Sequence, residues 1–146
     1  MGKILRSLVL VLTCSLLSGG VFAQHGKLII EMEGFRNDDG NVRLGLYNSE
    51  EDFLKDGGSY KRFYCEIEDG KCVVDTGELP FGEYAVALLH DENLNKKMDY
   101  SWMKIPKEGF GFSNNPKVKL SAPSFSDTKV TLDVPEKRIK ITVKYM

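Results

Sequence analysis

Residues that bind metals or act as nucleophiles are scarce in this sequence. Its 146 residues include only three cysteines and two histidines. Cys65 and Cys72 are too few thiolates for a structural zinc site, and no histidine lies near them in the sequence. The histidines are not accompanied by a nucleophile motif, and the glycines beside Phe110 and Phe112 lack the spacing and the lysine of a phosphate-binding loop. These absences disfavour catalysis, and we expect a protein that is not an enzyme.

A strong charge of either sign is also lacking. The net charge of the whole chain is −1, and residues 24–146 carry 18 Lys and Arg against 21 Asp and Glu, a net charge of −3. A mildly acidic domain offers no electrostatic basis for binding nucleic acid or an anionic membrane surface. We therefore expect no nucleic-acid partner.

The only long apolar run lies at the N-terminus. Lys3 and Arg6 precede an uncharged segment from Ser7 to Val21, and small residues follow up to Ala23. This order is typical of a signal peptide, residues 1–23, that is cleaved near Ala23. A transmembrane anchor would need about 20 unbroken apolar residues, and the residue before Cys14 is too large for a lipoprotein site. The pattern predicts export to the periplasm or the extracellular medium, with no membrane span after cleavage.

Alternating apolar and polar residues dominate residues 24–146 and predict β-strands. We expect about seven strands and no long helix, with the first two strands forming one hairpin and the third and fourth another. The expected strands are residues 28–33, 42–47, 60–67, 71–76, 82–89, 130–134 and 139–145. The pattern predicts one all-β domain over residues 24–146, an antiparallel two-sheet sandwich of immunoglobulin-like or prealbumin-like Greek-key type.

Two local signals support this fold. Cys65 and Cys72 flank a turn and are predicted to form a disulfide across a hairpin, because export places them where disulfides persist. Tyr84 follows Pro80 and Gly82 at the start of a strand that is apolar on both faces. Sandwich domains often place a tyrosine there, with its hydroxyl bonded back to the corner backbone.

The longest connection runs from Asp91 to Lys117 and has no clear period, so we expect any functional site to lie there. Asp91, Asn93, Asn95 and Asp99 have the spacing of the first ligands of a calcium loop. Calcium is accordingly the one cofactor considered. The other interpretation of these residues is a turn whose Asp and Asn side chains bond their own backbone.

The same connection offers a candidate binding surface. Its aromatic residues could form an exposed patch, or could fold over the sandwich and seal one end of the core. His90 with Asp91 or Glu108 could also form an acid–base pair, which is the basis of an alternative hydrolase function. The candidate surface residues are His90, Trp102, Glu108, Phe110, Phe112 and Asn114.

Several blocks of this sequence occur together, and in the same order, in a known family. They are Leu79-Pro80-x-Gly82-x-Tyr84-Ala85, His90-Asp91-Glu92-Asn93 with Asn95 and Asp99, Ile105-Pro106, Glu108 to Asn115, and Ala122-Pro123-Ser124-Phe125. In these blocks the chain resembles the bacterial exported family named domain of unknown function 2141. That family usually has glycine where this chain has Leu94 and Lys96. The resemblance implies an exported β-sandwich and no particular activity.

These features together predict an exported module of the cell envelope with a binding or structural role. Its partner could be an envelope protein, a glycan or a small molecule, and the sequence does not choose among them. Calcium binding through the loop from Asp91 to Asp99 is the first alternative function.

Overall fold

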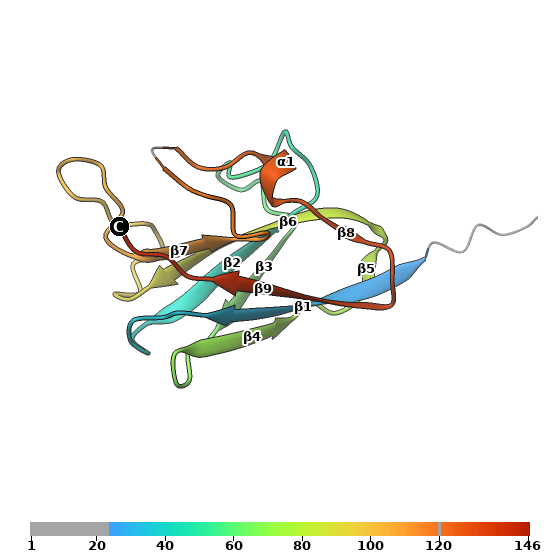
Figure 1. Cartoon of the computed structure of the whole chain (residues 1–146), viewed down its shortest axis with the longest axis horizontal. Coiled ribbons are helices and arrows are strands. Elements are labelled where there is room, and N and C mark those ends of the chain that lie inside the picture. Colours follow the sequence, from blue (N-terminus) through green and yellow to red (C-terminus); the bar gives the residue numbers. More distant parts are fainter. Residues whose placement is uncertain (1–23, 120) are drawn as a thin grey trace, which may run out of the picture.

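A computed structural model describes residues 24–119 and 121–146 (Figure 1). The predicted signal peptide lies outside these residues. The described chain forms nine strands and one short helix. Their bounds are β1 (His25–Glu33), β2 (Asn41–Tyr47), β3 (Lys61–Cys65), β4 (Lys71–Asp75), β5 (Leu79–Pro80), β6 (Gly82–Asp91), β7 (Gly109–Phe112), α1 (Phe125–Thr128), β8 (Val130–Leu132) and β9 (Glu136–Thr142). No helix in the described part of the chain is long and apolar enough to cross a membrane.

The strands form two sheets that pack face to face. Strands β4, β1, β5 and β9 make one sheet, and β3, β2, β6, β7 and β8 make the other. Apolar side chains from both sheets fill the space between them, among them Leu28, Ile30, Met32, Val42, Leu44, Val86, Leu88 and Ile141. The predicted all-β two-sheet sandwich is therefore confirmed.

Strand periodicity explains which strands the sequence predicts and which it misses. Every second residue is buried in β2 and in β4, as alternation predicts for strands with one face in the core. Strand β6 is buried on both faces over much of its length, again as predicted. The count of about seven strands is too low, because β5 and β7 have only two and four residues. Such short strands show no period.

Both predicted hairpins are wrong. Strand β1 lies in one sheet and β2 in the other, and the same is true of β4 and β3. A strand with one buried face has the same pattern whether its neighbour in sequence is beside it or across the core. Strand β1 instead pairs with β4 in antiparallel and with β9 in parallel orientation, so the sandwich is not wholly antiparallel.

The predicted disulfide is present, but it joins different elements. The Cα atoms of Cys65 and Cys72 are 6.3 Å apart, within the range that a disulfide spans. Cys65 ends β3 and Cys72 lies in β4, so the bond connects the two sheets and does not cross a hairpin within one sheet. The crosslink holds the turn between the sheets closed.

Strand β6 is the element that positions the functional end of the molecule. It pairs with β2 along one edge and with β7 and β8 along the other. At its start the Tyr84 hydroxyl donates to the Pro80 carbonyl at 2.7 Å, and the ring is buried, which confirms the predicted tyrosine corner. At its other end are His90 and Asp91. The strand thus anchors the long connection that follows it.

Candidate functional site

Asp91 begins the site as a buried carboxylate at the end of β6. One of its oxygens accepts a hydrogen bond from the Asn95 backbone amide at 3.0 Å, and the other accepts one from the Lys96 backbone amide at 2.8 Å. The Arg43 Nε lies 4.0 Å from the same carboxylate. Leu94 and Lys96 have φ values of 59° and 70°, the left-handed region that favours glycine. Asp91 therefore closes a tight turn whose backbone at positions 94 and 96 favours glycine.

The other three predicted calcium ligands meet beside this turn. The Asn93 side-chain amide donates to the Asp99 carboxylate at 2.6 Å, and the Asn95 side-chain amide donates to both Asp99 oxygens at 3.0 Å. The loop therefore brings Asn93, Asn95 and Asp99 together, with amide nitrogens toward the carboxylate. Within residues 24–119 and 121–146, no group of three or more His, Cys, Asp or Glu side chains is placed to hold a metal ion.

Glu108 closes the same loop from its far end. Its side chain is 3% exposed, and its two oxygens accept hydrogen bonds from the backbone amides of Glu92 and Asp99, each at 3.1 Å. By accepting these two backbone hydrogen bonds, the Glu108 carboxylate holds both ends of the segment from Glu92 to Asp99 in place. Glu108 is consequently absent from the surface on which the sequence placed it.

His90 is fully buried and both of its ring nitrogens are engaged. The Nε2 atom lies 2.8 Å from the Asp39 carbonyl, which can only accept, so Nε2 carries the proton. The Nδ1 atom lies 2.7 Å from the Tyr145 hydroxyl. A Cβ at Gly109 would lie 2.6 Å from the Tyr145 ring, so only glycine leaves room for that ring. Burial raises the pKa of the Tyr145 phenol.

A hairpin projects from this framework. Residues 99–107, which we name the arm, are closed by hydrogen bonds from the Lys107 amide to the Asp99 carbonyl at 2.8 Å and from the Ser101 amide to the Ile105 carbonyl at 2.8 Å. Trp102 lies at the tip and is 91% exposed. Figure 1 shows the connection after β6 extending beyond the end of the sheets, near the C-terminus.

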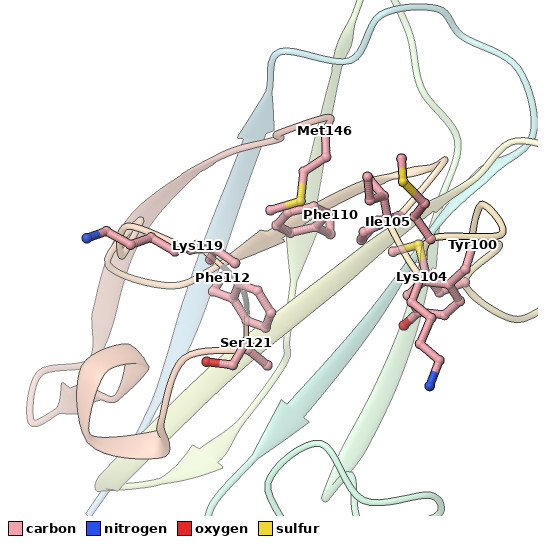
Figure 2. A pocket seen from close by; sticks show the side chains of 13 residues that line it. Tyr100, Lys104, Ile105, Phe110, Phe112, Lys119, Ser121 and Met146 are labelled. Carbon is pink, nitrogen blue, oxygen red and sulfur yellow. The ribbon is translucent and has the colours of Figure 1, made fainter.

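An apolar hollow of about 420 Å³ lies between the arm and β7. Figure 2 shows Phe110, Phe112 and Met146 on one side of it and Tyr100 and Ile105 on the other. We name it the terminal hollow. It shares Phe110 and Phe112 with a second, more polar hollow of about 550 Å³ over the outer face of the β3-β2-β6-β7 sheet.

The six predicted surface residues do not form one exposed patch. His90, Glu108 and Phe110 are buried, and Phe112 is partly buried, whereas Trp102 and Asn114 are exposed. Both interpretations of the aromatic residues are therefore met in part: the phenylalanines cover the end of the sandwich, and the tryptophan does not. Asn114 donates to the Lys129 carbonyl at 2.8 Å, away from the arm.

Sequence reasoning missed the methionines of the terminal hollow. Met98, Met103 and Met146 all line it, although Met146 is far from the other two in sequence. Met98 and Met103 stand in the predicted connection, where a cluster of flexible apolar side chains was the available signal. No sequence signal points to Met146, because only the fold brings the C-terminus beside the arm.

Comparison with known proteins gives a single family. No curated protein and no solved structure matches the chain. The family model described as "Uncharacterized protein conserved in bacteria (DUF2141)" matches residues 30–140, which include most of both sheets and the whole arm, but not Tyr145 and Met146. The resemblance in the sequence blocks is thereby confirmed, and the chain belongs to this bacterial family.

Proposed function

We propose that the protein is an exported binding module whose ligand occupies the terminal hollow. The observation that carries the proposal is the hollow itself, which is lined mainly by apolar and aromatic side chains. Its volume of about 420 Å³ is in the range of small-molecule sites, about 300 to 1,000 Å³. The ligand we expect is a small molecule, or the end of a larger one, with an apolar group that fills the hollow.

Hydrogen bonds that hold two of the walls, the arm and β7, support this role. The arm is closed by backbone hydrogen bonds, and Glu108 fixes the loop that carries it. The opposite wall belongs to β7, which pairs with β6. A preformed site loses less conformational entropy on binding than a mobile loop.

Two features support export. The first 23 residues have the order of a signal peptide. The disulfide between Cys65 and Cys72 is of the kind that persists in an oxidising compartment.

A role without catalysis is supported by the state of the polar groups. His90 is buried with both nitrogens engaged, and the Glu108 oxygens accept backbone bonds. A general base must reach the proton that it takes from a substrate. Neither group is accessible for that task.

Calcium binding is a second candidate function, favoured by the meeting of Asn93, Asn95 and Asp99. Half a turn of each amide would present oxygen in place of nitrogen, and calcium takes six to eight oxygens. If calcium binds, a hundredfold excess over its dissociation constant should stabilise the wild type by about 2.7 kcal/mol and leave Asp99→Ala unchanged. An equal response of both proteins in thermal melts would reject this candidate.

The hollow is tested by titration with anilinonaphthalene sulfonate, a dye that fluoresces on apolar surfaces. We expect saturable binding to the folded wild type. Ala122 lines the hollow and is exposed, so Ala122→Phe should fill the site and weaken binding. Thr131→Phe, an exposed position on β8, is the matched control and should bind as the wild type does. Equal binding by both variants would contradict the proposed site.

A further inference from the structure

The tip of the arm exposes Trp102, a large side chain that does not line the terminal hollow and is 91% exposed. Its neighbours Tyr100 and Met103 line the hollow but are also 56% exposed. Large aromatic residues are mostly covered in folded proteins, and a contiguous exposed group marks an interaction site. Backbone hydrogen bonds hold the arm that carries this group.

The segment that carries this tip is also rich in lysine. The exposed lysines of this segment form no ion pair among the described residues, and they are Lys96, Lys97, Lys104 and Lys107. Residues 93–107 carry these four lysines against one carboxylate, Asp99, and the adjoining Glu92 is paired with Arg36. This segment is thus positively charged, although the net charge of the domain is negative.

We propose that the arm docks on an anionic phospholipid bilayer. Trp102 and Met103 enter the boundary between headgroups and acyl chains, where the amphipathic ring of tryptophan is most stable. Lys104 and Lys107 face the lipid phosphates, and their aliphatic stems lie along the apolar region. The proposal rests on the binding role of this end of the sandwich. An apolar group held in the anionic bilayer would then enter the terminal hollow directly from the lipid.

Trp102 is the only tryptophan in the sequence, so its fluorescence reports on the arm directly. The full chain is expressed, and the protein is purified after the cell has processed it. It is then mixed with vesicles of equimolar phosphatidylglycerol and phosphatidylcholine. We expect a blue shift of the emission and quenching by lipids with brominated acyl chains. Both signals should be reversed by about 0.5 M salt, which screens charges beyond a few ångströms. Vesicles of phosphatidylcholine alone should give a much weaker response.

Charge variants test the role of the lysines. Each lysine near an anionic surface strengthens binding about fivefold, so Lys104→Gln with Lys107→Gln should weaken it about 25-fold. The matched control replaces Lys71 and Lys137, which lie on β4 and β9, and should change it less than about twofold. Unchanged melting temperatures are expected for both, since all four lysines are outside the core.

Specific results would overturn the proposal. A Trp102 emission that does not respond to anionic vesicles would reject docking on lipid, as expected if the tip binds an acidic protein instead. Equal responses to anionic and zwitterionic vesicles would reject the role of the lysines. If the dye binds the hollow but the Trp102 emission does not change on adding vesicles, only the lipid inference fails. If Trp102 inserts but the dye titration shows no site, the proposed hollow fails.

Discussion

Replacing Glu108 by alanine should destabilise the whole domain, although the residue lies in a loop connection. The substitution leaves the amides of Glu92 and Asp99 without their acceptors at 3.1 Å. A hydrogen bond to a charged group contributes about 1.5 to 3 kcal/mol. Two such bonds give a loss of about 3 kcal/mol in the free energy of unfolding, because the two amides are only partly buried and water can replace some of the bonding.

The effect can be measured by urea and thermal unfolding of the purified protein. For a domain of this size, a loss of about 3 kcal/mol lowers the melting temperature by about 10 °C. Glu108→Gln keeps one acceptor oxygen and should lose about half as much. Glu51→Ala is the control, since Glu51 is exposed and its side chain forms no hydrogen bond among the described residues. In Glu108→Gln, hydrogen exchange of the Glu92 or Asp99 amide should accelerate locally.

A loss below about 0.5 kcal/mol for Glu108→Ala, the size expected of an ordinary surface change, would refute this reasoning. It would mean that the loop is not held by Glu108 and that the arm is not preformed.

Three further outcomes are expected. Tyr84→Phe should cost about 1 kcal/mol for the lost corner bond, and Tyr84→Ala about 3 to 5 kcal/mol by urea unfolding; near-neutral values for both would contradict the buried corner. Reducing the disulfide of Cys65 and Cys72 should cost about 2 to 3 kcal/mol, and an unchanged melting temperature would contradict its role. Hydrogen bonds from Arg36 lower the pKa of Glu92, so their stabilisation is present above the unfolded value of about 4.3 and is lost as pH falls through the lower folded value. Because Arg36 is nearly half exposed, Glu92→Gln should remove only about 0.5 to 1 kcal/mol of this pH dependence, and equal unfolding curves between pH 7 and 3 would contradict it.

Periodicity predicts the class of fold well and its pairings poorly. Alternation along β2 and β4 identifies both as strands with one buried face. The same alternation cannot show that β1 pairs with β9, which comes more than 100 residues later and runs parallel to it. Pairing depends on packing between distant segments, and a local pattern does not contain it.

The candidate site, like the fold, could be predicted from the sequence only in part. Calcium binding and a turn closed by its own side chains are the two interpretations of Asp91, Asn93 and Asn95, and the structure forms the turn. Trp102 is exposed for a reason outside its own chemistry: backbone bonds on either side of it make it the tip of a hairpin. Met146 reaches the hollow only because β9 returns the C-terminus to this end of the sandwich.

The central claim is that the terminal hollow binds an apolar group, and an amide chemical-shift map tests it most directly. Decanoate, a single-chain amphiphile, is added below its micelle concentration to the isotope-labelled protein. The account predicts saturable shifts confined to the arm, β7, the lining residues Val118, Lys119, Ser121 and Ala122, and Met146, with β4 and the turn before it unchanged. Shifts spread evenly over both sheets, or no shifts near Phe110 and Phe112, would contradict it.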